Sequence, residues 1–537
     1  MPHARSFLFA LLVLVATAGR AEVVLAPLFT DHAVLQRDKP IPIWGRAEAG
    51  EKITVTFAGQ THATTAAKDG RWLVMLEALP AQVAGTDLVV TGKNTVTISD
   101  VVVGEVWLCS GQSNMEFTVD ARAGTWQANA RVERAATEIA GARFPLIRHV
   151  RIAPTVAPTP AETVKTSSWE LTTPETVGGF TAVGYFFARD LFQKLNVPIG
   201  VINSSVGGTP VEAWLSPAAL ASAPALAVVN ERWTKNIAEY PAKKAQYDAD
   251  RAAWLAAEAA AKAAPAPTPV AKAKTKTPPL TPHAAFLKAN PRPRPRAPRG
   301  PGDTWTPTGL FNGMINPLLP YALRGALWYQ GESNTDHPSE YRALFSALIT
   351  AWRGHFGQGD FPFYFVQLAN FKAAYEPAPH QWPLLREAQT ETLELPQTGQ
   401  AITIDIGNPD DIHPTNKQDV GRRLALLARN RVYGITGNDT GPTFAGLTRE
   451  GSALRVKFTH ASDGLVAHDQ PAQSLEIAGV DRVFHPAQAR IVRDSLLVSA
   501  PAVPEPVAVR YAWTNSPVAN LFNGSGLPAA PFRSDRW

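Results

Sequence analysis

Short apolar runs alternate with polar and turn residues over the first part of the chain. The runs 41–44, 53–57, 72–76 and 88–90 are separated by Gly50, Gly59, Gly70 and Gly92. This spacing predicts short strands joined by tight turns. We therefore expect residues 22–103 to form an N-terminal module of the β-sandwich type, which caps the protein structurally or faces carbohydrate.

The pattern changes from residue 104 onward. Continuous apolar runs now alternate with segments of helical periodicity; the runs include 101–108, 199–203, 326–329, 363–368 and 401–404. Such a pattern is typical of an α/β domain, with a parallel sheet and helices on both of its faces. Residues 104–435 are predicted to form this domain. Functional sites in such sheets collect beyond the carboxyl ends of the strands.

An insertion is predicted at residues 217–303. Its first part places Trp233, Tyr240, Tyr247 and Trp254 seven residues apart, which predicts one aromatic helix face packed against the body of the protein. Its second part, 259–302, is rich in Ala, Pro, Lys and Arg, and we expect it to be extended or disordered. Residues 436–537 return to alternation and are predicted to form a second β module with a tail that folds back over the α/β domain.

The first residues resemble an export signal. Arg5 precedes an apolar stretch at 6–15, and small residues follow up to position 21. We expect residues 1–21 to be removed and the mature protein to be exported, periplasmic or extracellular, without a membrane anchor; a retained signal anchor is the alternative. The single cysteine, Cys109, excludes an internal disulfide, and we expect it to be a buried core residue.

The formal net charge of +5 does not predict nucleic-acid binding. Nine Lys and Arg residues and no Asp or Glu lie between Ala259 and Gly302, so the remainder of the chain carries a slight negative charge. A basic tract alone is a weak signal for a nucleic-acid partner. With 45% hydrophobic and 18% charged residues, the chain as a whole is globular.

Ser113 has the setting of a nucleophile. It follows the apolar run 101–108 within Gly111-Gln112-Ser113-Asn114, where a tight turn presents a hydroxyl at the rim of a sheet. Near the other end of the chain, the sequence D-x-x-H offers a base, His413, and a carboxylate, Asp410. We predict that Asp410 orients His413 and that His413 activates Ser113; Asp411 is the alternative carboxylate.

These motifs resemble those of SGNH (GDSL-like) hydrolases and, more narrowly, the sialate O-acetylesterase family. The resemblance is carried by residues 106–116, 328–334 and 405–414, and covers most of residues 24–535. It implies a flavodoxin-like parallel sheet and an acetyl group as the acyl part of the substrate. It also implies an acetylated sugar or glycan as the partner, with no cofactor and no metal.

An oxyanion hole needs a backbone N–H at the nucleophile, a flexible glycine N–H and one side-chain amide. We expect backbone N–H groups of Ser113 and Gly208, with Gly207 as the alternative to Gly208. SGNH enzymes carry Asn in G-x-N-D, whereas this chain reads Gln330-Gly331-Glu332-Ser333-Asn334, so Gln330 is our first candidate for the third donor and Asn334 the second.

The expected substrate-binding residues are drawn from the same motifs and from one helix. They are Gln112, Asn114, Glu332 and Arg386. For Glu332, an anchoring contact to backbone or Arg386 is the alternative to contact with sugar hydroxyls. Trp214, Trp328 and Trp382 are candidates for stacking on sugar, with core packing as the preferred interpretation.

Two further functions compete with sialate deacetylation. The acetyl groups could belong to plant polysaccharides such as xylan or xyloglucan, and a non-catalytic glycan-binding protein could retain the same scaffold. The complete set of Ser113, His413 and Asp410 argues against the second alternative, because a binding protein has no chemical need for all three. No zinc-binding or phosphate-binding motif occurs in the sequence.

Overall fold

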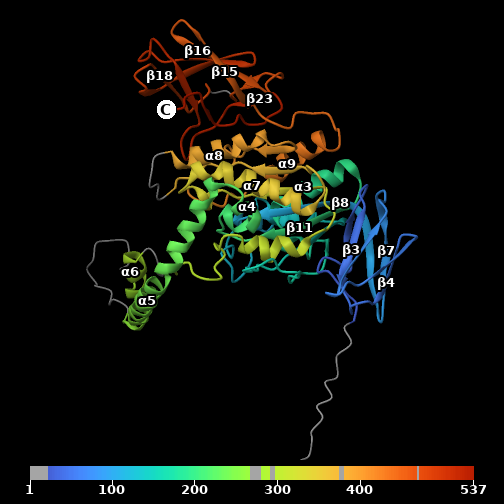
Figure 1. Ribbon diagram of the computed structural model, residues 1–537. Coiled ribbons are helices and arrows are strands. Elements are labelled where there is room, and N and C mark those ends of the chain that lie inside the picture. Colours follow the sequence, from blue (N-terminus) through green and yellow to red (C-terminus); the bar gives the residue numbers. More distant parts are fainter. Residues whose placement is uncertain (1–21, 266–279, 291–296, 374–379, 469–470) are drawn as a thin grey trace, which may run out of the picture.

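The computed structural model describes residues 22–265, 280–290, 297–373, 380–468 and 471–537. A central sheet with helices on both faces is flanked by the N-terminal strands at one side and, beyond α8 and α9, by a separate group of C-terminal strands (Figure 1). The predicted export signal, 1–21, lies outside the described residues. Within those ranges, no helix combines the length and the apolar character that crossing a bilayer requires.

One long strand, β8 (Thr95–Gly111), belongs to both the N-terminal strands and the central sheet. Its first half pairs antiparallel with β7 (Gln82–Thr91), and its middle pairs parallel with β2 (Val34–Gln36). Its second half pairs parallel with β11 (Ile199–Ser205) and β12 (Gly325–Tyr329). Every residue from Val101 to Gly111 is buried, because this half lies inside a sheet that is covered on both faces.

The other N-terminal strands follow the alternation that the sequence predicts. β4 (Lys52–Phe57) pairs with β5 (Gln60–Thr65) and β7, while β1 (Val24–Leu25), β3 (Ile41–Arg46) and β6 (Arg71–Leu76) form a separate antiparallel sheet. In β6 every second residue is buried. These alternate side chains join the core that also holds residues of β4, as expected for strands with one solvated face.

The central sheet is mixed rather than purely parallel, which corrects the prediction. Its parallel strands lie in the order β9-β11-β8-β12-β13-β14, where β9 is Phe144–Arg151, β13 is Phe363–Val366 and β14 is Thr398–Ala401. The short strand β10 (Glu170–Thr172) adds to β9 in the antiparallel sense, and β7 does the same on β8. Periodicity within single strands does not specify these edge pairings, which tertiary contacts decide.

Helices cover both faces of the parallel strands. α3 (Ala182–Leu195) and α9 (Lys417–Arg431) share a core with Cys109, Leu327 and Tyr329. α7 (Pro338–Phe356) and α8 (Gln381–Glu391) pack into the opposite core with Ala326 and Trp328, the intervening residues of β12. Alternate residues of one strand thus enter different cores. Cys109 is fully buried, as expected, and burial raises the pKa of its thiol.

The predicted insertion is helical over more of its length than expected. It contains α4 (Pro217–Ala221), α5 (Ala227–Ala263) and α6 (Pro282–Ala289), whereas residues 266–279 and 291–296 lie outside the described residues. The Ala-rich stretch extends α5 through residue 263, and Thr281 caps α6 by accepting from the backbone N–H of Ala284. The extended conformation predicted from residue 259 onward is therefore wrong for these two parts.

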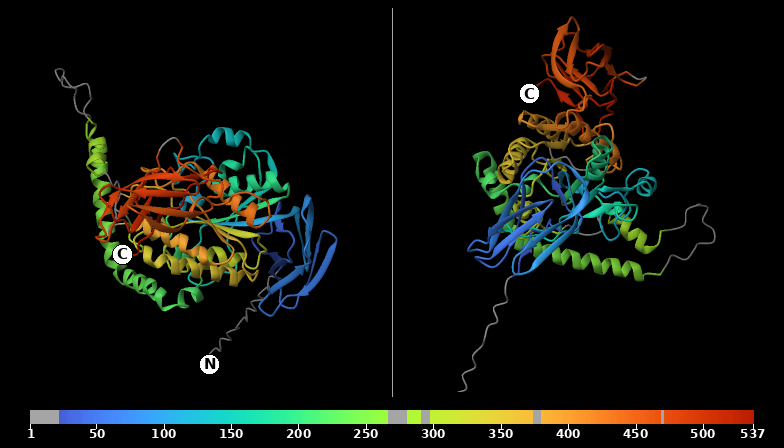
Figure 2. Two further views of the ribbon diagram at one scale, coloured as in Figure 1. Left: turned by 90° about the horizontal axis from the view of Figure 1, so that it is seen from above. Right: turned by 90° about the vertical axis from the view of Figure 1, so that its right-hand side faces the viewer.

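Only the start of the aromatic face of α5 lies near the body of the protein, where Trp233 borders a pocket together with Leu220 and Thr308. Figures 1 and 2 show that α5 projects away from the central sheet and that α6 packs beside its far end. There Trp254 lies 5.3 Å from Phe286 of α6, measured between ring centroids. For Trp254, the predicted packing partner is thus replaced by a helix from the insertion itself.

The C-terminal strands form two four-stranded antiparallel sheets and one short pair. The first sheet has the order β15-β16-β21-β20 and the second β19-β18-β22-β24. The bounds are β15 Thr443–Glu450, β16 Ala453–Thr459, β17 Leu465–Val466, β18 Leu475–Ala478, β19 Phe484–Pro486, β20 Gln488–Val492, β21 Ser495–Ser499, β22 Ala508–Tyr511, β23 Phe522–Asn523 and β24 Phe532–Arg533.

Arg386 of α8 joins the C-terminal part to the central domain. Its fully buried guanidinium donates to the backbone carbonyls of Leu368, Ala369, Thr514 and Asn515 at 2.8–2.9 Å. Burial lowers the pKa of Arg386 to about 9. Because the side chain has no exposed surface and bonds to four carbonyls, the prediction that Arg386 binds substrate is wrong, and its role is structural.

We expect Arg386→Met to destabilise the fold. The substitution removes this donor from four carbonyls, among them those of the buried residues Leu368 and Ala369, and each buried group left unsatisfied costs roughly 1–3 kcal/mol. Removing the desolvated cation offsets part of that cost, so we expect a net loss of about 2–4 kcal/mol in the free energy of unfolding. Arg536→Met is the matched control, because Arg536 is 70% exposed and pairs with Glu387 and Glu391 at the surface.

Chemical denaturation followed by circular dichroism measures both variants. Arg536→Met is expected to change the free energy of unfolding by less than about 1 kcal/mol. Equal stabilities of the two variants would contradict the structural role of Arg386.

Candidate active site

The end of β8 places Ser113 at the carboxyl edge of the central sheet. Gly111 has φ +128°, and a Cβ at this position would lie 2.2 Å from the carbonyl oxygen of Tyr329, so only glycine fits here. Ser113 then opens α1 (Ser113–Glu116) and is 7% exposed. Its backbone N–H has no acceptor among the described residues, as expected for the first residue of a helix.

His413 lies directly against Ser113, as predicted. The Nε2 atom of His413 is 2.9 Å from the Oγ atom of Ser113. The histidine belongs to the loop between β14 and α9, and β8 and β14 both end at this edge of the sheet. The distance allows direct transfer of the hydroxyl proton to the imidazole.

The carboxylate beside His413 is that of Asp411, not of Asp410. Asp411 Oδ1 accepts the backbone N–H of His413 at 2.9 Å and lies 3.6 Å from Nδ1 of the same residue. Asp410 instead pairs with Lys372 at 3.3 Å, and its side chain is 82% exposed. The loop folds the Asp411 side chain back onto its own turn, so the placement expected for Asp410 is corrected to the alternative residue.

The surroundings of His413 favour its neutral form. Burial lowers the pKa of His413 to about 4, and the nearby ammonium of Lys417 adds to this effect, while Asp411 opposes it. A neutral imidazole holds a lone pair that accepts a proton, so His413 is suited to act as a base over a wide pH range.

Asn114 connects three segments that form the site. Its Nδ2 atom donates to Glu332 Oε1 at 2.7 Å and to the carbonyl of Ile412 at 3.0 Å, and its Oδ1 accepts from Lys417 Nζ at 2.5 Å. Lys417 is fully buried, and this burial lowers its pKa to about 7. Burial also raises the pKa of Glu332, whose Oε2 atom has no hydrogen-bond partner in the described part of the chain.

Two residues predicted to bind substrate therefore belong to this buried group. Asn114 is 1% exposed, and both of its amide atoms are engaged. Glu332 contacts Asn114, not the predicted anchor Arg386. The polar atoms of both side chains therefore lie inside the protein and are not open to substrate. Lys417 was not predicted from the sequence. Its position closely after the histidine motif was the signal that could have indicated it.

Gln112 keeps one free donor next to the nucleophile. Its Oε1 atom accepts from the backbone N–H of Ser333 at 3.3 Å and of Gly331 at 3.5 Å. Its Nε2 atom has no acceptor among the residues described, although the side chain is only 3% exposed. Gln112 thus remains a candidate for contact with substrate.

The two glycines after β11 have different environments. The N–H of Gly207 donates to Glu116 Oε2 at 2.8 Å and is therefore occupied. Gly208 has φ +70°, a Cβ there would meet nothing within 4 Å, and its N–H has no acceptor within the described ranges. Of the two candidate glycines, Gly208 is the one that can donate to an oxyanion.

Gln330 and Asn334 form a buried network instead of facing open space. Gln330 Nε2 donates to Asn334 Oδ1 at 2.7 Å and to the carbonyl of Thr209 at 3.1 Å, while Gln330 Oε1 accepts from Tyr341. Asn334 Nδ2 donates to Glu212 Oε2 at 2.8 Å. Because both donors of Gln330 are used, it cannot serve as the third oxyanion donor without breaking this network. Asn334 retains one amide hydrogen.

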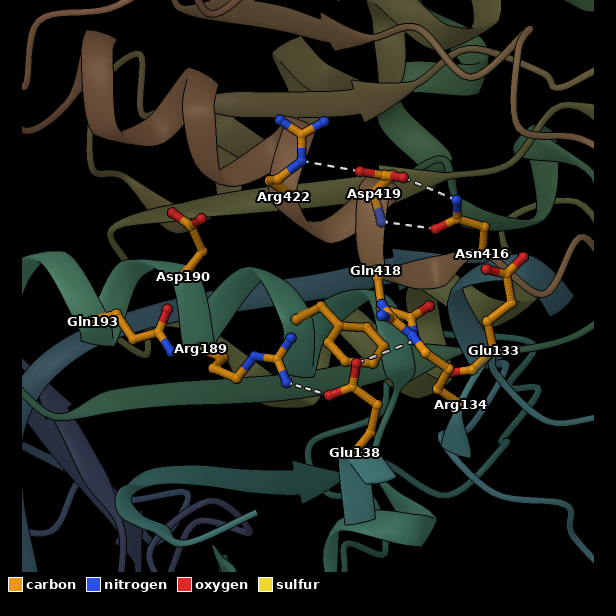
Figure 3. Close-up of a pocket in the computed structure, with 11 residues that line it drawn as sticks. Glu133, Arg134, Glu138, Arg189, Asp190, Gln193, Asn416, Gln418, Asp419 and Arg422 are labelled. Atoms are coloured by element: carbon orange, nitrogen blue, oxygen red, sulfur yellow. Dashed lines mark hydrogen bonds and ion pairs between the residues drawn. The ribbon is translucent and has the colours of Figure 1, made fainter. Parts of the chain in front are cut away.

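A polar pocket of about 300 Å³ lies beside the start of α9 (Figure 3). Its charged side chains pair with one another: Arg189 with Glu138 at 2.5 Å and Arg422 with Asp419 at 3.0 Å. In the described part of the chain, no group of three or more His, Cys, Asp or Glu side chains is placed to hold a metal ion.

Known proteins resemble this chain over nearly its whole length. The family described as carbohydrate esterase, sialic acid-specific acetylesterase, matches residues 303–429. Sialate O-acetylesterase of Rattus norvegicus is 28% identical over 97% of this chain and 96% of its own, and that of Homo sapiens is 28% identical over 94% and 91%. The crystal structure of a carbohydrate acetylesterase from Xanthomonas citri has a TM-score of 0.77 and 35% identity, covering 96% of this chain and all of that one.

The protein is a carbohydrate O-acetylesterase. An enzyme of this class is not a non-catalytic glycan-binding protein, so that alternative is set aside. The chain belongs to the sialate O-acetylesterase family, as its motifs predicted.

Substitution of the two neighbouring carboxylates tests which one orients His413. We expect Asp411→Asn to lower kcat roughly 10- to 100-fold, because the imidazolium formed during catalysis loses its nearest negative charge. Asp410→Asn is the matched control and is expected to change kcat less than about twofold. Steady-state kinetics on p-nitrophenyl acetate measures both, and the reverse order of effects would restore Asp410 to this role.

The pH dependence of kcat/KM tests the environment of His413. Because the pKa of His413 is lowered to about 4, the base stays neutral above that pH, and activity is lost as pH falls through about 4. An acidic limb near 6.5, the ordinary value for histidine, would contradict the buried environment. Initial rates between pH 3 and 8 at constant ionic strength supply the profile.

Proposed function

We propose that this enzyme is an exported serine esterase that removes O-acetyl groups from sialic acids through an acetyl-enzyme intermediate. The observation that carries the proposal is the 2.9 Å contact between Ser113 Oγ and His413 Nε2 at the carboxyl edge of the sheet. The export signal proposed for residues 1–21 rests on the sequence pattern alone. The sialate substrate rests on the names of the relatives.

In the acylation step, Ser113 Oγ forms a bond to the acetyl carbonyl carbon while His413 Nε2 takes the hydroxyl proton. The carbonyl oxygen becomes an oxyanion, which the backbone N–H groups of Ser113 and Gly208 stabilise. When the bond between the carbonyl carbon and the sugar oxygen breaks, His413 returns its proton to that oxygen. Asp411 stabilises the imidazolium between these two transfers.

In the deacylation step, water attacks the acetyl-enzyme and gives its proton to His413. Release of acetate returns the proton to Ser113, so the cycle consumes one water molecule and needs no cofactor. The free Nε2 donor of Gln112 is the available third donor for the oxyanion, in place of Gln330, and the amide of Asn334 lies in the same buried network as Gln330.

We also infer an SGNH-like layout for the central domain at 104–435, flanked by β modules at 22–103 and 436–537. The parallel strands lie in the order β9-β11-β8-β12-β13-β14, and without the additional parallel strand β9 the order is β11-β8-β12-β13-β14. Numbered along the chain, this order is 2-1-3-4-5, the flavodoxin-like arrangement in which ligands bind where the direction of connection reverses. β8 occupies that position and carries Ser113 at its end.

Replacement of the nucleophile tests the mechanism. We expect Ser113→Ala to reduce acetate release by a factor of about 10⁴ or more, because among the described residues the hydroxyl of Ser113 is the one that hydrogen-bonds to the imidazole of His413. Ser110→Ala is the matched control: Ser110 lies on β8, the strand that leads to Ser113, is fully buried and has no partner for its hydroxyl among the described residues. Acetate release by Ser113→Ala at the rate of the control would refute the assignment of Ser113 as the nucleophile.

The substrate remains to be decided between acetylated sialosides and acetylated plant polysaccharides. Acetate release across sialosides, xylan, xyloglucan and pectin separates the two, and the sialosides are expected to be cleaved fastest. A series of nitrophenyl esters tests acyl specificity in the same preparation. Activity that rises from acetyl to octanoyl would instead indicate a lipase-type enzyme.

A further inference from the structure

Trp126 covers the catalytic histidine and is itself open to solvent. Its indole ring stacks on the imidazole of His413, with ring centroids 4.4 Å apart and planes inclined by 29°. The side chain is nevertheless 45% exposed, which is unusual for so large an apolar group. By contrast, the tryptophans considered for sugar stacking from the sequence, Trp214, Trp328 and Trp382, are at most 5% exposed.

The N–H edge of Trp126 lies next to the nucleophile. A Cβ built on Gly207 would be 3.4 Å from Ser113 Cβ and 3.5 Å from Trp126 Nε1. Both atoms therefore border the same small space at the turn after β11. Trp126 Nε1 has no hydrogen-bond acceptor among the described residues, so it is a free donor at the mouth of the site.

The loop that carries Trp126 is fixed at several points. Gln127, which is 1% exposed, accepts from the backbone N–H of Thr118 at 2.8 Å and donates to the carbonyls of Thr118 and Asp120. Further along, the carbonyl of Glu133 accepts from Gln418 of α9 at 2.6 Å (Figure 3). The backbone N–H of Glu133 also donates to Thr415, two residues after His413. Trp126 and His413 are thus held by a common framework.

The same loop also contacts the oxyanion turn. Arg122 pairs with Glu116 at 3.5 Å, and Arg151 pairs with the same carboxylate at 3.1 Å. The second oxygen of Glu116 accepts the N–H of Gly207. The position of Trp126 is therefore determined by contacts on both sides of Ser113.

The proton transfer from His413 to the leaving group determines where the sugar binds. In the mechanism proposed above, His413 Nε2 returns its proton to the sugar oxygen that leaves the acetyl group. That oxygen must lie within hydrogen-bond distance of Nε2, so the sugar ring lies beside the imidazole and beside the indole stacked on it. The exposed indole offers an apolar surface for the C–H groups of a pyranose ring and one N–H donor for an oxygen.

We propose that Trp126 is the binding platform for the sugar ring that bears the acetyl ester. This assignment rests on the proposed function, because it takes the sugar oxygen as the proton acceptor. Trp126 then determines specificity for a carbohydrate leaving group over a small alcohol.

Kinetics on two acetate esters with different leaving groups tests the proposal. The probes are ethyl acetate, whose leaving group is too small to reach the indole, and the acetylated sugar that the wild-type enzyme cleaves fastest. We expect Trp126→Ala to lower the ratio of kcat/KM for the sugar to kcat/KM for ethyl acetate roughly 10- to 50-fold, mainly through KM for the sugar. Trp126→Phe keeps an aromatic face without the N–H and is expected to give an intermediate ratio.

The matched control is Trp537→Ala, because Trp537 is 43% exposed and contacts Arg482 in the C-terminal part of the chain. It is expected to leave the ratio unchanged. Turnover of ethyl acetate in the same preparations reports a folded site. An equal loss on both esters in Trp126→Ala would refute the platform and assign Trp126 to the support of His413.

The result that would contradict the proposed function differs from the result that would contradict the role of Trp126. A wild-type enzyme that cleaves ethyl acetate but releases no acetate from any sugar would refute the carbohydrate leaving group, and the platform with it. A wild-type enzyme that cleaves the sugar, with an unchanged ratio in Trp126→Ala, would overturn only the platform.

Discussion

The side-chain amide of Asn114 is the interaction on which the geometry of the site depends. Its donors bond to the loops after β12 and before α9, and its oxygen accepts from Lys417 of α9 itself. Asn114 directly follows Ser113, and the carbonyl of Ile412, to which it donates, directly precedes His413. A short chain of covalent and hydrogen bonds therefore sets the distance between nucleophile and base. The three motifs recognised in the sequence are the three segments that this amide joins.

Burying Asn114, Lys417 and Glu332 costs free energy, and the same burial changes the acid–base properties of the site. Lys417 and Glu332 are both removed from water, which lowers the pKa of the first and raises that of the second. Their mutual attraction, transmitted across Asn114, offsets part of the desolvation. The ammonium of Lys417 in turn disfavours a proton on His413, which burial already disfavours. The same charge that holds Asn114 in place thus helps to keep the base neutral.

Sequence patterns predict this site where local rules decide the structure and fail where tertiary contacts decide it. Ser113 and His413 follow from motifs at the carboxyl ends of buried strands, which must share one edge of the sheet. The choice between Asp410 and Asp411 depends on how one turn folds back. Gln330 and Arg386 have the right chemistry for a site, but tertiary contacts occupy both donors of Gln330 and four of the five donors of Arg386. Trp126 belongs to no motif, because its role arises only from its contact with His413.

Part of the N-terminal module belongs to the catalytic sheet, because β2 and β7 pair directly with β8. β8 runs from its pairing with β7 to Ser113 without interruption, so displacement of its first half is transmitted to the nucleophile. Glu105, in the middle of β8, is fully buried and pairs with Arg324 at 2.6 Å and with Arg37 from the N-terminal part. Although burial opposes its ionisation, the two guanidiniums hold the pKa of Glu105 below its usual value. Removing the N-terminal strands would take Arg37 away from Glu105 and two neighbouring strands away from β8. This dependence favours the interpretation of the N-terminal module as a structural cap rather than as a separable carbohydrate-binding module.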